Sequence, residues 1–424
     1  MAHNTAVKGL RCLKCDQLYP LGQYFEGCPS CRTEKSVSNL TVVYDYNAIK
    51  EKLNKDVFSF RCKSLWRYWE LLPVDPDNAV TLGEGMTPLI MCNRLGKELN
   101  ISVLFLKDES CNPTWSFKDR LCSVAVSHAK EINAPAVTVS STGNHGAATA
   151  AYAARAGLPC IIFTVESVPQ TMKTLMQSYG AKVVACKTYV DRWILMHECI
   201  KRFGWYPTGN YVNPPVGSNY YGIEGYKSIA YEIIESLSWE VPDVVIIPVA
   251  YADGLAGIWK GFKEFKELGF ISRLPKLVAV EPFGPLANAL RKGINYVEEV
   301  STSPSVAFSI AADISTYQGL QALKESQGTA VTVRDDEIIE MQQQLGSTEG
   351  IYAEMASVTS LVGAYILRKS NWIKPDEKVV CLLTSTGLKD PGTTAVHMPE
   401  VPLVSTDMTE LKIALKKYYN FKLD

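Results

Sequence analysis

The chain has 424 residues, of which 47% are hydrophobic and 21% charged, and its formal net charge at pH 7 is −1. This composition predicts a soluble globular protein of two or three domains. It argues against binding to nucleic acid or to a membrane surface through bulk charge, because there is no basic excess and no long charged block. Residues 1–8 lack an apolar segment, and no later run approaches the roughly 20 residues that span a bilayer, so we expect a cytoplasmic protein.

Four cysteines near the N-terminus have the spacing of a metal site. Cys12 and Cys15 form one C-x2-C pair, and Cys28 and Cys31 form a second. Two such turns can present four thiolates to one zinc ion, and four protein ligands leave no open position, so we expect a structural site. Four unrelated buried cysteines and a nucleic-acid-binding ribbon are the alternatives, but the segment has no clustered basic face. Without a signal peptide, the remaining cysteines predict reduced thiols.

The middle of the chain has the pattern of an α/β fold. Residues 45–76 are rich in aromatic side chains and predict a helical connector that packs on a core. Beyond them, short β-branched runs alternate with helical periods, which predicts mostly parallel sheets with helices on both faces and ligands at the carboxyl ends of the strands. The expected strands cover 103–106, 136–139, 160–164, 182–186, 244–249, 277–281 and 379–384, and the clearest helices cover 170–179, 189–203, 255–268 and 357–369.

One lysine stands where a strand gives way to a helix. Lys118 lies between the apolar Phe117 and the charged Asp119, and we expect the helix to begin at Leu121. An amine held against apolar walls has a lowered pKa, because desolvation disfavours the ammonium ion, and the neutral amine can form a Schiff base with an aldehyde. A solvated surface lysine is the alternative interpretation.

Two further turns join a strand to a helix through small and polar residues. The turn at 140–146 precedes an alanine-rich helix expected at 147–156, and the turn at 250–257 follows the strand at 244–249. Hydroxyls and backbone N–H groups converge at helix N-termini, whose partial positive charge favours a carboxylate or a phosphate. Each turn taken alone is more often an ordinary N-cap.

Together these segments resemble the fold type II pyridoxal-phosphate enzymes, the tryptophan synthase β-like superfamily, and within it the threonine synthase family. The motifs that carry the resemblance are Gly83-Glu84-Gly85-Met86-Thr87-Pro88-Leu89, Lys107-Asp108-Glu109, Asn112-Pro113-Thr114, Ser116-Phe117-Lys118-Asp119-Arg120, Ser141-Thr142-Gly143-Asn144, Ile223-Glu224-Gly225 before Lys227, Glu349-Gly350-Ile351 with Glu354 and Ala356-Ser357, and Leu383-Thr384 with Gly387-Leu388-Lys389-Asp390.

The resemblance implies an α/β architecture of two three-layer lobes, with mostly parallel sheets around a central cofactor cleft and a small N-terminal zinc ribbon. The implied domains are the zinc ribbon at 1–45, a helical connector and the start of the large catalytic lobe at 46–120, the small lobe at 121–215 and the large lobe at 216–424. It also implies a homodimer.

Individual roles follow from the same resemblance. Lys118 would bind pyridoxal 5'-phosphate as a Schiff base and act as general base on the α-carbon of the substrate. Asn144 would hydrogen-bond the hydroxyl of the cofactor ring, and Thr384 would meet the ring nitrogen. The cofactor phosphate would be held by Ala250, Ala252, Gly254, Leu255 and Gly257, and the substrate would be contacted by Thr87, Trp115, Ser141, Thr142, Gly143 and His145.

The sequence departs from the threonine synthase pattern at several positions. The family normally has glycine where Trp115 stands, and an arginine that helps to hold the substrate phosphate where Gly222 stands. Loss of this arginine removes charge-assisted hydrogen bonds. Asp253 replaces a glycine and Gly254 an asparagine, and a carboxylate that faces a phosphate would repel it unless it points away. These changes leave the identity of the substrate undecided, but they do not affect the expected cofactor.

We therefore expect a lyase that acts on an L-amino acid with a leaving group at the β- or γ-carbon. One hypothesis is a threonine synthase, which converts O-phosphohomoserine to threonine and phosphate, with Lys107, Lys227 and Lys389 as replacement cations or as solvated surface lysines. A second is a serine/threonine dehydratase-like enzyme, a diaminopropionate-type ammonia-lyase or a β-replacement synthase, in which Trp115 fills the vacated phosphate pocket. A non-catalytic pyridoxal-phosphate-binding protein is the third, and the presence of Lys118 argues against it.

Overall fold

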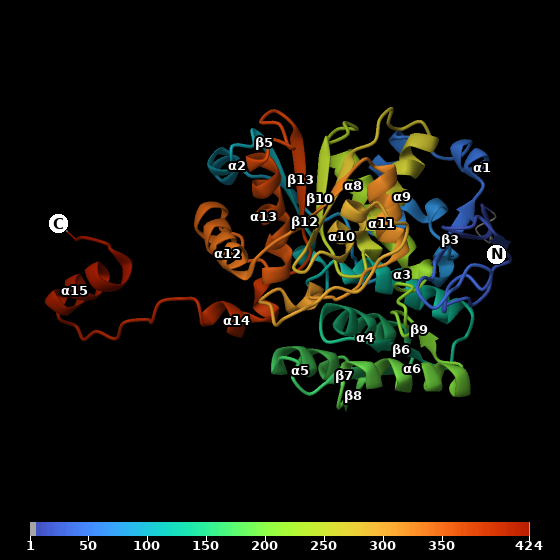
Figure 1. Cartoon of the computed structure of the whole chain (residues 1–424), viewed down its shortest axis with the longest axis horizontal. Helices are drawn as coiled ribbons and strands as arrows, with labels where there is room; N and C mark the ends of the chain where they lie inside the picture. Colours follow the sequence, from blue (N-terminus) through green and yellow to red (C-terminus); the bar gives the residue numbers. More distant parts are fainter. Residues whose placement is uncertain (1–5, 424) are drawn as a thin grey trace. The chain divides into compact units, whose positions relative to one another are not determined.

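The computed structural model describes residues 6–423, which form two compact units that divide after Lys389. Within the described residues, the first unit contains three β-sheets (Figure 1). The second unit contains α14 (Pro391–Ala395) and α15 (Met408–Tyr419). The domain boundaries expected at residues 45, 120 and 215 stay predictions.

A small antiparallel sheet lies at the N-terminal end of the first unit. Its central strand β1 (Val7–Cys12) pairs with β2 (Leu18–Tyr19) and with β3 (Leu40–Tyr44). The last residue of β1 is Cys12, so the first cysteine pair begins where the strand ends.

The connector that follows is less helical than predicted. After α1 (Tyr46–Lys50), it contains the short 3₁₀ helices η1 (Asp56–Phe60), η2 (Leu65–Leu71) and η3 (Pro76–Asn78). Arginine side chains link these short helices, because Arg67 donates to the carbonyl of Phe58 and Arg61 donates to that of Arg67. The aromatic packing is largely as expected, since Phe58 is buried, but Phe60 is 89% exposed.

The second sheet is parallel and has the order β8-β7-β6-β9. Alanine-rich α4 packs closely against α3, and the turn between β6 and α4 lies at the carboxyl edge of the sheet. The elements of this region are α3 (Lys118–Glu131), β6 (Val137–Ser140), α4 (Asn144–Ala156), β7 (Cys160–Val165), α5 (Gln170–Ser178), β8 (Lys182–Cys186), α6 (Tyr189–Phe203) and β9 (Tyr206–Pro207).

The largest sheet has the order β12-β11-β10-β13-β5-β4 and is parallel except for β4. Figure 1 shows α2, α12 and α13 on one side of it and α8 to α11 on the other, which explains why β10 is buried along its whole length. Its strands are β4 (Leu89–Met91), β5 (Val103–Asp108), β10 (Val244–Pro248), β11 (Lys276–Glu281), β12 (Thr329–Thr332) and β13 (Lys378–Leu383).

The remaining helices cover this sheet or connect its strands. The α-helices are α2 (Asn93–Leu99), α7 (Tyr220–Ile223), α8 (Lys227–Ser236), α9 (Asp253–Glu267), α10 (Pro285–Lys292), α11 (Tyr317–Glu325), α12 (Asp335–Glu349) and α13 (Met355–Lys369). The 3₁₀ helices are η4 (Glu109–Cys111), η5 (Glu224–Tyr226), η6 (Phe308–Ile310) and η7 (Gly387–Lys389).

The α/β fold is confirmed, and each expected strand is present within one or two residues of its predicted bounds. Four helices begin two or three residues earlier than predicted, since α3 starts at Lys118, α4 at Asn144, α9 at Asp253 and α13 at Met355. The polar and small residues of a first helical turn do not follow the apolar period that reveals the rest of the helix. Residues predicted in the turns therefore lie on the helix ends themselves.

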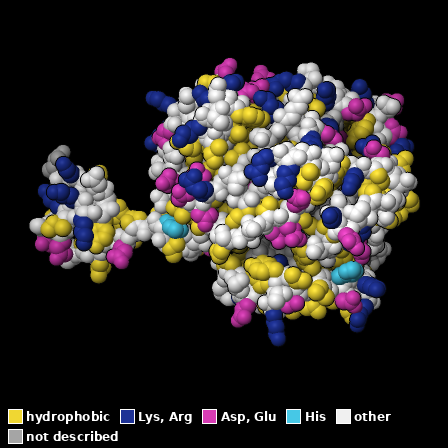
Figure 2. All heavy atoms as spheres, in the orientation of Figure 1, with side chains coloured by type: hydrophobic (Ala, Val, Ile, Leu, Met, Phe, Trp, Pro, Cys, Tyr) yellow, Lys and Arg dark blue, Asp and Glu magenta, His cyan; other side chains and the backbone are white. Residues whose placement is uncertain are grey.

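The helices and the charge pattern of one face can be compared with the expectations from composition. Among the described residues, no helix is both long and apolar enough to pass through a bilayer. On the face drawn in Figure 2, basic and acidic side chains are interspersed, in agreement with the net charge of −1.

Candidate active site

Segments that lie far apart in the sequence meet around Lys118, the first residue of α3. Phe117 joins two of them, because its backbone N–H donates to the carbonyl of Thr384 at 3.0 Å and its ring lies against Gly254. A Cβ atom at Gly254 would lie 2.9 Å from the Phe117 ring, so glycine permits this approach. The lysine, the start of α9 and the end of β13 thus meet at the carboxyl edge of the large sheet.

The amine of Lys118 lies in an apolar setting without an ionic partner. Its Nζ lies 4.8 Å from the centre of the Phe117 ring and 5.7 Å from that of Tyr226. No residue within 6–423 forms an ion pair with it. Burial lowers the pKa of Lys118, and the nearby carboxylate of Asp253 opposes this shift. The alternative of a solvated surface lysine is therefore wrong for Lys118, whose amine is suited to act as a nucleophile or base.

Asn144 is held by two residues of the opposite wall, and we call this group the Asn144 clamp. Asn144 Nδ2 donates to Glu354 Oε2 at 2.8 Å, and Asn144 Oδ1 accepts from Lys389 Nζ at 2.7 Å. Ser309 donates to the other oxygen of Glu354 at 2.5 Å. Because an ammonium can only donate, Lys389 fixes the orientation of the amide and leaves one N–H of Asn144 for a ligand. Burial lowers the pKa of Lys389 to about 8.

The turn before α4 uses its serine internally. Ser141 Oγ accepts from the N–H groups of Gly143 at 3.2 Å and Gly146 at 3.0 Å, which shapes the turn, whereas Thr142 and Gly143 remain partly exposed. His145 Nε2 is buried and has no hydrogen-bond partner among the described residues. Burial and the charge of Lys118 hold the pKa of His145 well below its usual value, so this imidazole is neutral at pH 7.

The turn before α9 presents backbone N–H groups. The hydroxyl of Ser315 donates to Ala250 O at 2.7 Å and that of Thr316 to Tyr251 O at 2.6 Å, so both carbonyls are engaged. Ala252 has a left-handed backbone with φ of 57°, and α9 begins at the next residue. The first N–H groups of a helix have no carbonyl partner within it, so Gly254 and Leu255 can donate to an anion.

Asp253 does not leave a free carboxylate in this turn. Its oxygens accept from Ser218 N at 3.1 Å, from Ser218 Oγ at 2.7 Å and from Gln318 Nε2 at 2.6 Å. Burial raises the pKa of Asp253, while Lys118 opposes that shift. The repulsion that this carboxylate would exert on a bound phosphate is reduced by these three donors.

Thr384 meets the site from the end of β13. Its hydroxyl lies 2.9 Å from Ser357 Oγ, and Ser357 also donates to Ser385 O at 3.1 Å. The side chain is buried, so a ring atom placed against it would be shielded from water. Gly257, the last residue of the predicted phosphate set, lies inside α9 against Tyr226.

Thr87 and Trp115, which were predicted to contact the substrate, lie in contrasting surroundings. Thr87 is buried and its hydroxyl donates to Glu109 at 2.6 Å and accepts from Arg120 at 3.2 Å, within an ionic network. Trp115 is 45% exposed and has a left-handed backbone with φ of 58°. The structure therefore does not bury the indole of Trp115 in a pocket.

The lysines considered as replacement cations are not solvated. Lys107 pairs with Glu232 at 2.7 Å, and Lys227 pairs with Glu224 at 2.6 Å, and the side chains of both lysines are 0% exposed. Both ammonium groups are therefore neutralised. Lys389 is the one of the three that contacts the candidate site, through Asn144.

Nothing in the sequence placed Glu354 and Lys389 against Asn144. Both stood in the quoted motifs, but motif membership does not say which side chains touch. Only their positions could have indicated a role in the site. Glu354 directly precedes α13 and Lys389 closely follows β13, at the carboxyl edge where ligands bind in such sheets.

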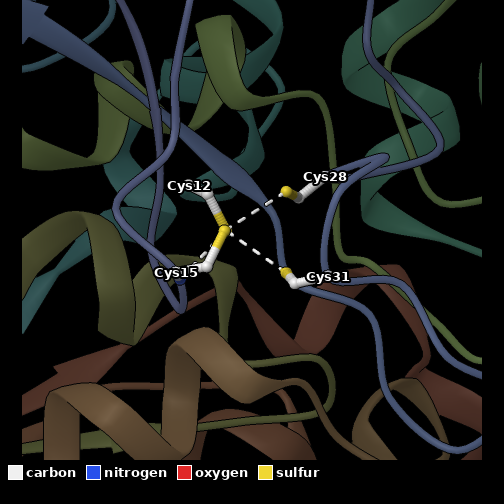
Figure 3. Close-up of side chains that lie close together, drawn as sticks. All are labelled: Cys12, Cys15, Cys28 and Cys31. Carbon is white, nitrogen blue, oxygen red and sulfur yellow. Dashed lines mark hydrogen bonds between the residues drawn. The ribbon is translucent and has the colours of Figure 1, made fainter.

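The four N-terminal cysteines converge as Figure 3 shows. Their sulfur atoms all lie within 4.8 Å of one another, and Cys12 Sγ is 3.5 Å from Cys31 Sγ while Cys15 Sγ is 3.7 Å from Cys28 Sγ. A tetrahedral zinc ion with Zn–S bonds of about 2.3 Å would place its sulfur ligands roughly 3.8 Å apart. The cluster therefore has the size of a four-thiolate metal site.

The N-terminal sheet is hydrogen-bonded to the large lobe. Asn39 Nδ2 donates to Ser218 O at 3.0 Å, and Ser218 in turn donates to Asp253. Lys260, on α9, donates to Val42 O at 2.7 Å. The cysteine region is thus directly connected to the helix that begins at the anion-binding turn.

The residues around Lys118 fit a cofactor with an aldehyde, a ring and a phosphate. Buried polar atoms without a hydrogen-bond partner among the described residues surround or neighbour the lysine, and unpaired buried polar atoms are costly unless a ligand satisfies them. They include Ser116 Oγ, Ser140 Oγ, His145 Nε2 and Tyr226 OH. An unpaired amine, an oriented amide and free helical N–H groups complete the donor set.

Comparison with known proteins defines the class of the molecule. The family model described as "Pyridoxal-phosphate dependent enzyme" matches residues 80–385. The fold agrees, since the maize serine racemase structure superposes with a TM-score of 0.63 at 18% identity, covering 74% of this chain and 91% of that one. The processed form of threonine deaminase isoform 2 from Solanum lycopersicum also gives 0.63 at 19% identity, covering 84% and 90%. This chain is a pyridoxal-phosphate-dependent enzyme.

Sequence relatives narrow the class. The chain is 38% identical to the threonine synthase of Methanocaldococcus jannaschii over 96% of this chain and 99% of that protein. It is 35% identical to that of Methanosarcina acetivorans over 96% and 98%, and 38% identical to that of Halalkalibacterium halodurans over 78% and 92%. The chain belongs to the threonine synthase family, and it is a threonine synthase-like lyase.

Proposed function

We propose that this protein is a threonine synthase that converts O-phosphohomoserine and water to threonine and inorganic phosphate, with pyridoxal 5'-phosphate bound at Lys118. The observation that carries the proposal is the unpaired amine of Lys118, whose pKa burial lowers, at the junction of two anion-binding turns. The 38% identity to the Methanocaldococcus jannaschii threonine synthase over nearly the whole chain supports the same substrate.

Bound pyridoxal phosphate supplies an electron sink for negative charge that develops at the α-carbon of an amino acid. Lys118 removes the α-proton as a neutral amine and returns a proton later, since its lowered pKa keeps the free base available near neutral pH. The rings of Phe117 and Tyr226 exclude water from this amine.

The other proposed contacts position the reactants. Asn144 donates its remaining N–H to the cofactor's ring hydroxyl, and the neutral hydroxyl of Thr384 meets the ring nitrogen. The turn residues Ala250 and Ala252, with Gly254 and Leu255 at the start of α9, would hold the cofactor phosphate, and Gly257 would allow the close packing of α9 against Tyr226. The substrate is bound by Ser141, Thr142, Gly143 and His145, with Thr87 and Trp115 as outer contacts.

A structural zinc ion bound by Cys12, Cys15, Cys28 and Cys31 belongs to the same proposal. The size of the sulfur cluster supports binding of the ion. Its role is proposed to be structural, because four thiolate ligands leave no open coordination position for a substrate. The protein is proposed to be a cytoplasmic homodimer. All twelve cysteines lie in the described part of the chain and none forms a disulfide there, which suits a reducing compartment, whereas the dimer rests on the family alone.

The test is turnover by the purified holoenzyme. Release of threonine and phosphate in equal amounts from O-phosphohomoserine is the expected result. Serine, threonine, phosphoserine and diaminopropionate are the comparison substrates, with ammonia and keto acid as products. Turnover of one of these without any turnover of O-phosphohomoserine would overturn the proposed substrate.

A further inference from the structure

The first turns of α6 lie beside the anion-binding turn before α9. Helix α6 follows β8 and begins with a capping box at Thr188 and Asp191, so its start lies at the carboxyl edge of the parallel sheet. The ring of Trp193 lies 6.3 Å from that of Tyr251, which belongs to the turn at 250–257. The start of α6 is therefore placed to contribute to the candidate site from the sheet of β6 to β9.

Arg192, on this part of α6, is a buried cation without an acidic partner. Its side chain is 8% exposed, its Nε donates to Tyr189 O at 3.3 Å, and its guanidinium lies 4.6 Å from the centre of the Tyr189 ring. No carboxylate within residues 6–423 forms an ion pair with it. Its charge is felt at Tyr251, where it opposes the burial that raises the pKa of that phenol.

Other buried arginines of this protein are neutralised. Arg120 is bonded to both Glu109 and Glu232 at 2.6 Å, and Arg67 pairs with Glu235 at 3.2 Å. A buried guanidinium without a counter-ion is costly, and several of its N–H donors remain available. Arg192 is thus built to meet an anion that the polypeptide does not supply.

We infer that Arg192 binds a phosphate monoester beside the turn that contains Tyr251, with the phosphate of the cofactor and that of the substrate as the two sources. A planar guanidinium can donate two parallel hydrogen bonds to a phosphate, and the charge-assisted pair gives both strength and orientation. The inference rests on the proposed function, because that function brings both phosphates to this edge of the sheets.

The packing of Gly222 explains why a phosphate-binding arginine would come from α6. A Cβ atom at Gly222 would lie 3.0 Å from Leu121 Cγ and 3.0 Å from Ala125 Cβ, both on α3. A side chain at position 222 would therefore need α3 to move by a few tenths of an ångström in this chain. Arg192 provides the cation from another helix.

The experiment compares native holoenzyme with Arg192→Met, Arg192→Lys and the control Arg202→Met. Arg202 lies on the same helix, its side chain is 70% exposed and it pairs with Glu198. Titration calorimetry with inorganic phosphate measures anion binding without requiring turnover. Cofactor affinity is measured separately on the stripped proteins with pyridoxal 5'-phosphate and with pyridoxal, which lacks the phosphate.

We expect Arg192→Met to weaken phosphate binding by about 10- to 100-fold, the loss of a hydrogen-bonded pair to a charged group. Arg192→Lys should recover part of the loss, and Arg202→Met should behave as native. Weaker phosphate binding and a higher KM for O-phosphohomoserine, with cofactor affinity unchanged, assign Arg192 to the substrate. Weaker binding of pyridoxal 5'-phosphate, with pyridoxal unaffected, assigns it to the cofactor.

The inference is overturned if Arg192→Met and Arg192→Lys bind inorganic phosphate and pyridoxal 5'-phosphate as the native protein does, or if Arg202→Met loses as much affinity as Arg192→Met. If Arg192→Met does not fold, the test relies on Arg192→Lys. The inference is then overturned if Arg192→Lys binds inorganic phosphate and pyridoxal 5'-phosphate with native affinity and if the KM for O-phosphohomoserine does not change with ionic strength. Phosphate binding that depends on Arg192 in an enzyme inactive on O-phosphohomoserine would reject the proposed substrate and retain the anion site.

Discussion

Replacing Lys389 by methionine tests whether the Asn144 clamp orients the site. The substitution removes the ammonium that donates to Asn144 Oδ1 at 2.7 Å and keeps a side chain of similar length. A hydrogen bond to a charged group contributes roughly 1.5–3 kcal/mol, so we expect kcat/KM to fall by about 10- to 100-fold. Lys389→Arg, which keeps a charged donor, is the matched control and should lose less activity.

The pH dependence of kcat/KM makes the test specific. Lys389 is 5% exposed, and its pKa of about 8 lies below the ordinary 10.5. The neutral amine is a weaker donor, so the native kcat/KM should decrease as the pH rises through about 8. Lys389→Arg should move this decrease beyond the measured range, because a guanidinium stays charged, and Lys389→Met should lack it.

The same pKa fixes the sign of an effect on stability. The folded protein binds the proton of Lys389 less tightly than the unfolded chain, so the stability of native protein relative to Lys389→Met should rise between about pH 8 and 10.5. At about 1.4 kcal/mol per pKa unit, the whole change is about 3 kcal/mol, and urea unfolding at pH 7 and 9.5 samples part of it. A native kcat/KM that stays flat from pH 7 to 9.5, or a decrease that persists unchanged in Lys389→Arg, would refute this account of the clamp.

Three further substitutions test other parts of the site. Lys118→Ala should abolish turnover and the visible absorbance of the lysine-bound cofactor together, and retention of both would show that another residue binds it. Cys12→Ser should lower the zinc content measured by mass spectrometry and the Tm, while cofactor binding persists; lost turnover with zinc still bound would contradict a structural metal. Arg120→Met should destabilise the protein by about 3–5 kcal/mol in urea unfolding, because Glu109 becomes an unpaired buried charge and Glu232 keeps only Lys107 as a partner, and a loss below about 1 kcal/mol would contradict this.

The sequence predicted the strands well because their signal is local. Buried parallel strands are continuous apolar runs, and β10 (Val244–Pro248), which is buried at every residue, lies within the bounds 244–249 that the pattern indicated. The connector at 45–76 was predicted less well, since its short 3₁₀ helices are linked by hydrogen bonds from arginine side chains to backbone carbonyls. Local periodicity cannot report such contacts.

The candidate site was predictable in its centre but not at its edges. Lys118 and Asn144 were singled out by the resemblance to a known family, because each of their turns taken alone also had an ordinary structural interpretation. Lys389 and Arg192 are ordinary charged residues in the sequence, and only burial and the identity of their neighbours distinguish them from solvated ones. Burial of a charge depends on residues distant in the chain, so no local pattern reveals it.

The bonds from Asn39 to Ser218 and from Ser218 to Asp253 have a consequence for how the protein unfolds. They join the N-terminal sheet to the first residue of α9, so opening of the cysteine region should release the anion-binding turn in the same cooperative event. Amide hydrogens of β3 and of early α9 should then exchange with solvent at matched rates. The N-terminal sheet would behave as an integral part of the catalytic body, and it could not be exchanged between relatives as an independent module.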